Sequence, residues 1–412
     1  MRNDAWFLLS LVALATGLLI NQAGLTVLGA LMLSVFGIAW GWNRWALWGV
    51  AYERRLSERR AFLGETITLE ISVTNRKLLP LAWLHVQDDF PAQLTLLDAE
   101  LAPSAQPNRG YLNSLLSLRW FERVRWRLRL CSESRGIYYL GPARLAAGDL
   151  FGLLRCDEER AHRDVLVVYP RLYSLEALGL PPKEPFGETR SPLRILEDPG
   201  RTVGVRDYGP GDPLKRVHWK ATARRQALQV RVYEPTTQRQ LLVCLNVSTL
   251  PNNWQGIVPE MLEAAVSVAA TLAKGGDDCK YQVGLLANGC WPLSDQPLKV
   301  LPGRSPYQLT HILEALAAIQ GLPTARLADL MMKESAHLPW GATLVVVTAV
   351  LEDDLAEAMV RLRVAGRRVV LLSLDPQQPR EPLPGVLCYR LCAPVGEQAL
   401  IRFEAVAGEG GR

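Results

Sequence analysis

The first part of the chain is an apolar stretch. Residues 5–43 contain no charged side chain, and this run exceeds the roughly 20 residues that one membrane-spanning helix needs. Turn-forming residues interrupt it at 21–24, where the sequence reads Asn-Gln-Ala-Gly. The pattern predicts a transmembrane hairpin of two short helices, at about 6–20 and 25–42. A secretory signal peptide with a cleavage site at 13–15 is the alternative, which the second apolar stretch disfavours.

Positive charges predict the orientation of this hairpin. Arg2 precedes the first helix, several arginines follow the second, and the connecting turn has none. Because loops rich in Lys and Arg stay in the cytoplasm, the rest of the chain is expected on the cytoplasmic side of a bacterial inner membrane. Gly37 and Gly41 form a GxxxG pair, which permits close helix approach. Interfacial tryptophans are expected where the second helix leaves the lipid: Trp40, Trp42, Trp45 and Trp48.

Apolar and polar residues then alternate with a period of two. Residues 66–74 and 123–130 each place apolar side chains on one face, which is typical of half-buried strands. Such strands separated by short turns predict a small antiparallel β-sandwich. The second strand carries a basic stripe on its polar face, which is interpreted either as a solvated outer face or as a surface for anionic lipid or an acidic partner. The stripe consists of Arg123, Arg125, Arg127 and Arg129.

The last part of the chain alternates apolar strands with amphipathic helices. This order predicts a parallel, doubly wound α/β sheet. The predicted strands are 241–247, 281–287, 343–348 and 369–374, and the predicted helices are 257–274, 307–319, 324–337 and 355–365.

A distinctive turn and helix pattern occupies residues 206–224. Asp212 followed by Pro213 predicts a helix N-cap and first helical residue after a Gly-Pro-Gly turn. Asp212 and His218 are a weak candidate for an acid and a base, since no nucleophile signature accompanies them. The basic residues of this stretch suit either an anion or a domain interface: Lys215, Arg216, Lys220, Arg224 and Arg225.

This stretch resembles the signature of the domain of unknown function 58 family. The upstream Arg-Gly-Ile-Tyr at 135–138 and Asp-Leu-Phe-Gly-Leu at 149–153, and the apolar start, are also similar to that family. The resemblance implies a membrane protein often paired with a MoxR-type AAA+ ATPase, and it implies no enzymatic activity. The matching residues are Tyr208, Pro210, Gly211, Asp212, Arg216, Trp219, Lys220, Ala223 and Arg224.

The predicted α/β domain is similar in element order to a von Willebrand factor type A domain. In that fold, a metal-ion-dependent adhesion site opens with Asp-x-Ser-x-Ser after the first strand. The corresponding positions here are Asn246, Ser248 and Leu250, and Thr348 is followed by Ala349 where the fold often has an aspartate. Because both carboxylates are missing, Mg²⁺ would have few anionic oxygen ligands. We expect no metal or other cofactor, and Asn246, Ser248 and Thr348 remain candidate ligand-binding positions.

Composition changes this picture little. The net charge of +5 in 412 residues is mild, so no nucleic-acid partner is expected. The seven cysteines are scattered without metal-ligand spacing, which favours unpaired thiols in a reducing compartment. The sequence has no phosphate-binding loop, HExxH or GxSxG motif, so we expect a protein that is not an enzyme.

These observations predict a membrane-anchored, multidomain scaffold or adaptor that works with an AAA+ ATPase. One alternative is a metal-dependent adhesion-type binding protein, and another is an unrecognised hydrolase of the cell envelope. The predicted ranges are 1–52 for the transmembrane hairpin, 53–160 for the β-sandwich-like domain, 161–235 for the linker and signature region, and 236–412 for the von Willebrand factor type A-like domain.

Overall fold

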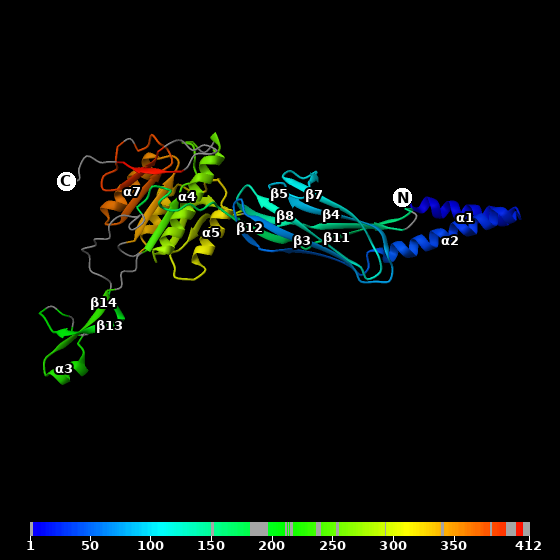
Figure 1. Cartoon of the computed structure of the whole chain (residues 1–412). Coiled ribbons are helices and arrows are strands. Elements are labelled where there is room, and N and C mark those ends of the chain that lie inside the picture. The colour runs from blue at the N-terminus through cyan, green and yellow to red at the C-terminus, as the bar shows by residue number, and fades with distance from the viewer. Residues whose placement is uncertain are drawn as a thin grey trace. The chain divides into compact units, whose positions relative to one another are not determined.

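The chain forms two compact units, Met1–Pro170 and Arg171–Arg412, in a computed structural model (Figure 1). Each unit is described by itself. The structure describes residues 3–149, 152–181, 197–210, 212, 214, 217–235, 240–252, 255–292, 294–338, 342–379, 381–392 and 401–406.

The first unit begins with two helices, α1 (Asn3–Leu19) and α2 (Ala23–Ala46). Asn21 adopts the left-handed backbone conformation, with a φ of 53°, in the turn between them. Among the described residues, α2 is the helix long and apolar enough to cross a membrane, whereas the apolar part of α1, Trp6–Leu19, is shorter. Of the two spans predicted for the transmembrane hairpin, α2 therefore has the length and composition of one.

Small residues allow α1 and α2 to pack closely. A Cβ atom built on Gly17 would lie 2.5 Å from the Thr26 backbone nitrogen, and one on Gly29 would lie 2.5 Å from that of Leu14. Gly37 and Gly41 meet nothing within 4 Å. The close approach between these two helices is therefore made at Gly17 and Gly29 and not at the GxxxG pair.

Twelve strands form three sheets in the first unit. The sheets have the orders β1-β3-β8-β5, β11-β10-β4-β7-β6 and β2-β12-β9. The strands are β1 (Val50–Leu56), β2 (Arg60–Phe62), β3 (Thr66–Asn75), β4 (Leu81–Pro91), β5 (Leu94–Leu96), β6 (Ala102–Pro103), β7 (Arg109–Leu118), β8 (Arg123–Ser132), β9 (Gly136–Leu140), β10 (Ala143–Gly148), β11 (Arg155–Arg160) and β12 (Asp164–Tyr169).

The alternation seen in the sequence places alternate side chains of β3 and β8 in the interior. Leu69, Ile71 and Leu130 are fully buried or nearly so, in one hydrophobic cluster. The two strands pair antiparallel from Thr66↔Cys131 to Thr74↔Arg123. Each buried apolar side chain is removed from water, which contributes roughly 1.5–3 kcal/mol.

The basic stripe on β8 is largely balanced by acidic side chains of the same unit. Arg127 Nε lies 3.1 Å from a Glu70 carboxylate oxygen on β3, and Arg129 Nη2 lies 2.7 Å from Asp98. Because Asp98 accepts hydrogen bonds from Arg129, the pKa of its carboxyl group is lowered. The contacts favour the interpretation of the stripe as a solvated outer face.

A seven-stranded sheet forms the centre of the second unit. Its order is β17-β16-β15-β18-β19-β20-β21, with β16, β15, β18, β19 and β20 parallel and the two edge strands antiparallel. The strands are β15 (Gln240–Leu245), β16 (Gln282–Cys290), β17 (Pro297–Val300), β18 (Thr343–Thr348), β19 (Arg368–Ser373), β20 (Leu387–Leu391) and β21 (Phe403–Ala405).

Four helices cover this sheet: α4 (Pro259–Asp278), α5 (Gln308–Ala318), α6 (Leu327–Ser335) and α7 (Asp353–Val364). Helices α6 and α7 share a hydrophobic cluster with Leu242 of β15 and Leu344 of β18. Helix α4 lies on the opposite face, because a Cβ atom on Gly276 would lie 2.5 Å from Leu241. Strands that are covered on both faces read as continuous apolar runs.

The signature region forms a small arm within the second unit. We define the arm as β13 (Glu197–Asp207), α3 (Trp219–Arg225) and β14 (Gln229–Pro235), with the two strands paired antiparallel. Helix α3 begins at Trp219, where the His218 side chain caps it, and Val217 forms a bridge to Val230. Pro213, at which the sequence predicted the start of a helix, lies outside the described residues.

Candidate functional site

A crevice of about 220 Å³ lies at the carboxyl edge of the seven-stranded sheet. Strand β15 is followed in sequence by β16 on one side, whereas β18 pairs with its other side. Ligands of open α/β sheets bind at such a switch point, beyond the carboxyl ends of the strands. The crevice is lined by Asn246, Ser248, Asn288, Pro323, Thr324, Ala325, Arg326, Leu327, Ala328, Glu352 and Leu355.

Neutral polar side chains form the floor of this crevice. Asn246 follows β15 and donates from Nδ2 to Thr348 Oγ1 at the end of β18, over 3.1 Å. Asn288 of β16 donates from Nδ2 to Asn246 Oδ1 over 2.8 Å and accepts the Val247 amide over 2.8 Å. Both amides are at least 95% buried. Three neighbouring strand ends are thus joined by amide and hydroxyl groups that satisfy one another.

The same contacts make this floor a poor fit to Mg²⁺. Asn246 Oδ1 accepts from Asn288 and from the Ser248 amide (3.1 Å), which uses both of its lone pairs. Thr348 Oγ1 accepts from Asn246 and donates to the Val350 carbonyl. Within the described part of the chain, no three His, Cys, Asp or Glu side chains gather where they could hold a metal ion. A hard cation would have to displace existing hydrogen bonds to gain uncharged ligands.

Charged side chains stand at the entrance of the crevice. Burial raises the pKa of Glu352, and the neighbouring Asp354 raises it further. Arg326 Nη1 lies 3.6 Å from Asp354 and is itself largely exposed. The crevice is smaller than the roughly 300–1,000 Å³ of typical small-molecule pockets. Its size and its polar floor suit a single polar side chain or a small polar group.

The sequence located part of this site. Asn246, Ser248 and Thr348 were predicted as neighbours, and the structure brings all three to one edge. Asn288 was missed because it lies inside the apolar run of β16. Glu352 was missed because acidic residues at the start of a helix are accounted for by the helix dipole. A polar residue at the end of an apolar strand run is the signal by which Asn288 could have been found.

Two of the predicted signature residues, Asp212 and Tyr208, make internal contacts of the arm. Arg206 donates to both carboxylate oxygens of Asp212, over 2.8 and 2.7 Å, and the Gly209 amide donates to the same carboxylate over 2.9 Å. The Tyr208 amide donates to the Leu228 carbonyl over 2.9 Å. Asp212 therefore closes the 209–212 turn. Two signature residues, Gly211 and Arg216, lie outside the described residues.

Other signature residues face solvent. Trp219 is 68% exposed, and Lys220, Ala223 and Arg224 are exposed beside it on α3. His218 Nδ1 accepts the Ala221 amide over 3.1 Å, which commits this ring nitrogen to capping the helix. Asp212 and His218 are thus each engaged in a local structural contact. Pro210 is exposed in the 209–212 turn.

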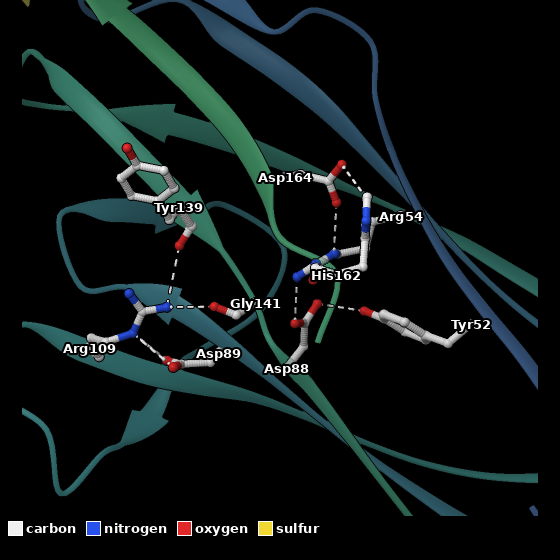
Figure 2. A network of polar contacts seen from close by, with 9 residues as sticks. All are labelled: Tyr52, Arg54, Asp88, Asp89, Arg109, Tyr139, Gly141, His162 and Asp164. Atoms are coloured by element: carbon white, nitrogen blue, oxygen red, sulfur yellow. Dashed lines mark hydrogen bonds and ion pairs between the residues drawn. The ribbon is translucent and has the colours of Figure 1, made fainter. Parts of the chain in front are cut away.

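A second group of ionisable side chains is buried in the first unit (Figure 2). Arg54 lies between Asp88 and Asp164, with nitrogen–oxygen distances of 2.8 and 3.1 Å, and donates to the His162 carbonyl. The Tyr52 hydroxyl donates to Asp88 over 2.5 Å. Burial raises the pKa of Asp88 to about 6, despite the opposing effect of Arg54. Because Arg54 is paired with both carboxylates and Tyr52 donates to one of them, we interpret the group as structural.

Comparison with known proteins finds a family that matches the signature and the α/β sheet. Residues 204–402 match the family described as "Protein of unknown function DUF58". The uncharacterized protein YeaD of Bacillus subtilis (strain 168) is 22% identical over 194 residues, which are 47% of this chain and 46% of YeaD. The chain thus matches about half the length of this curated relative. The resemblance predicted from the signature residues is confirmed over this range.

Similar solved structures cover only a minor part of the chain. The CARDB domain of a Pyrococcus furiosus protein is 12% identical and covers 29% of this chain and 91% of that domain, with a TM-score of 0.20. A cohesin module from a Clostridium perfringens glycoside hydrolase is 8% identical and covers 29% of this chain and 97% of that module, also with a TM-score of 0.20. Scores this low carry no argument about fold or function.

Proposed function

We propose that this chain is a non-enzymatic, membrane-anchored scaffold or adaptor that works with a MoxR-type AAA+ ATPase. The observation that carries the proposal is that the signature contains two kinds of residue, some that stabilise the arm and others that are exposed. Asp212 and Tyr208 stabilise the arm, whereas Trp219, Lys220 and Arg224 face solvent. Exposed tryptophan and arginine are the residues that most often dominate protein–protein interfaces.

Charge defines the kind of partner that fits the arm. Arg206 is paired with Asp212, but within the described residues of the arm Lys220, Arg224, Arg225 and Arg231 have no ion pair. We therefore propose that the partner presents an acidic surface with an apolar recess that accepts Trp219. Complementary charge would speed the encounter, and burial of the indole would supply affinity.

The apolar N-terminus supports the anchoring part of the proposal. We propose that α1 and α2 both enter a bacterial inner membrane as two spans, with the following units in the cytoplasm. The length and composition of α2, and the arginines after it, support this orientation. The parallel sheet and its polar carboxyl edge support a von Willebrand factor type A-like domain, a fold suited to binding.

Recovery of the partner from membranes tests the proposal. The full chain, tagged at its C-terminus, is solubilised from native membranes and captured, and the bound proteins are identified by mass spectrometry. We expect an AAA+ ATPase to be recovered with the wild type. Trp219→Ala and the double variant Arg224→Glu/Arg225→Glu should lose it at least tenfold.

Arg304→Glu is the matched control, because it inverts another exposed basic side chain of the same unit outside the arm. It should retain the ATPase. The proposal fails if no ATPase is recovered with the wild type, or if the arm variants and the control recover it equally.

The crevice at the switch point favours a second function, an adhesion-type binding protein that uses Asn246, Ser248 and Thr348. Titration calorimetry with Mg²⁺ and Mn²⁺ tests its metal-dependent form. Tight binding that Ser248→Ala abolishes would support this second function. From the hydrogen bonds that already occupy Asn246 and Thr348, we expect no heat beyond dilution.

A further inference from the structure

Two turns of the first unit meet beside the end of α2. The β3–β4 turn spans residues 76–80, and the β7–β8 turn spans residues 119–122. Asn75 joins them, because its Nδ2 donates to the carbonyls of Leu79 and Arg119, each over 2.9 Å. The Phe121 amide also donates to the Lys77 carbonyl over 3.3 Å. The two turns are therefore one structural element.

Lys77 fixes this element to the C-terminal end of α2. Its Nζ donates to the carbonyls of Trp45 over 2.8 Å, Trp48 over 2.7 Å, and Ala46. The last carbonyls of a helix lack intrahelical partners, and a cation there also offsets the helix dipole. Ala46 itself is fully buried against the sandwich. The turns consequently lie at the level where α2 ends.

Large apolar side chains project from these two turns. Leu78 is 75% exposed, Trp120 64% and Phe121 62%. We call these three residues the foot. Trp45 and Trp48, whose carbonyls Lys77 binds, are similarly exposed at the end of α2. The foot therefore continues a surface of tryptophans that starts on the apolar helix itself.

The requirements of the turns do not explain these residues. Phe121 has a φ of 54°, a conformation for which Gly or Asn is the usual choice and which is uncommon for a bulky residue. Both turns connect strands of different sheets, and adjacent, largely exposed apolar side chains on such turns mark a contact surface. The exposed Arg119 flanks the foot, and Arg76 lies in the first turn. Such cations suit the anionic headgroups of a cytoplasmic leaflet.

We propose that Leu78, Trp120 and Phe121 insert into the headgroup region of the membrane that α2 leaves, and so seat the β-sandwich on the lipid surface. Aromatic side chains at the end of a spanning helix prefer this interface. Lys77 holds the foot at that level. The proposal rests on the anchoring of α2 proposed above, and it adds a second, non-helical membrane contact.

Photocrosslinking to lipid tests this contact in the full chain. A photoreactive phenylalanine analogue replaces one residue at a time, and the protein is reconstituted into vesicles of phosphatidylethanolamine and phosphatidylglycerol. The test positions are Leu78 and Phe121. Leu31 of α2, which is 59% exposed, reports anchoring. Leu97, which is 51% exposed, is the matched control. Its amide binds the Arg129 carbonyl, about 24 Å along β8 from the β7–β8 turn.

We expect lipid adducts at Leu31, Leu78 and Phe121, and at least tenfold less adduct at Leu97. Adducts at Leu31 without adducts at Leu78 and Phe121 would overturn the foot and leave the anchoring intact. Absence of adducts at Leu31 would overturn both. Adducts of Phe121 with a second copy of the chain, or with another protein in place of lipid, would also overturn the proposal and would identify the foot as a protein interface.

Discussion

Arg54 balances the charges buried within the β-sandwich. It lies between Asp88 and Asp164, and the Tyr52 hydroxyl completes the environment of Asp88 (Figure 2). A buried carboxylate is costly unless cations and donors surround it. Burial nevertheless dominates, since the pKa of Asp88 is raised to about 6. The residue therefore titrates in the mildly acidic range.

We predict that Asp88 makes the free energy of unfolding depend on pH. The folded carboxyl group, with a pKa of about 6, holds its proton more tightly than the unfolded one, whose pKa is 3.8. The folded state therefore binds more protons between these values, and stability falls as pH rises from about 4 to about 6. A shift of this size corresponds to at most about 3 kcal/mol. Urea unfolding at several pH values measures it.

Asp88→Asn is the control for this titration. It keeps the shape of the side chain and removes the ionisable group, so the difference in unfolding free energy between wild type and variant isolates Asp88. That difference should decline between about pH 4 and 6 and stay level above. A difference that rises with pH would mean that Arg54 outweighs burial and lowers the pKa instead.

At the scale of elements, the two N-terminal helices pack through Gly17 and Gly29. Any side chain at Gly29 would meet the backbone of Leu14, which cannot move aside as a flexible side chain does. The rings of Phe7 and Phe36 lie 5.5 Å apart elsewhere along the same pair of helices. They provide a position at which the separation of the helices can be measured.

We predict that Gly29→Val separates α1 from α2, because helix pairs in lipid depend on close packing of small residues. The measurement is disulfide formation between Phe7→Cys and Phe36→Cys in a chain whose seven native cysteines are replaced. Its yield should fall several-fold. Gly41→Val, where a Cβ meets nothing within 4 Å, should leave it unchanged. Equal yields in both variants would contradict the packing.

The elements that the sequence predicted best are those with the clearest burial pattern. β18 has the predicted bounds, 343–348, because all six of its residues are buried and apolar or nearly so. The short strands β20 and β21, of which β21 is the edge strand, were missed, because their pairing is not visible in the local hydrophobic pattern. Asp212, the predicted N-cap, binds Arg206, and the helix start predicted at Pro213 lies outside the described residues.

The candidate site was predictable only in part for a similar reason. Residues that directly follow a strand, such as Asn246, can be assigned to the edge of the sheet from the alternation of elements alone. The walls of the crevice come from the 323–328 segment and from Glu352, whose positions depend on how helices α6 and α7 pack. The helix dipole already accounts for acidic residues at the start of α7. Nothing in the sequence therefore indicated that Glu352 also lies at the crevice.

At the scale of the molecule, helix α2 and the strands that follow it belong to one compact unit. Ala46 and Leu47 share a hydrophobic cluster with Val73 and Leu84 of the sandwich. Lys77 links the two further through the last carbonyls of α2. The α/β unit has its own hydrophobic cluster. We therefore expect the chain to unfold in two transitions, with the end of α2 and the sandwich lost together.

Lys77 and the cluster of the α/β unit provide one variant for each transition, measured by calorimetry on the full chain in detergent. Lys77→Met leaves carbonyls at the end of α2 without their charged donor, which should cost about 3 kcal/mol and lower the midpoint of the sandwich transition. Leu344→Ala opens a cavity in the α/β unit, where Leu344 is fully buried, and should cost about 2–5 kcal/mol. Each variant should leave the other transition in place. If Lys77→Met shifted both transitions equally, the two units would be energetically coupled and would not unfold independently.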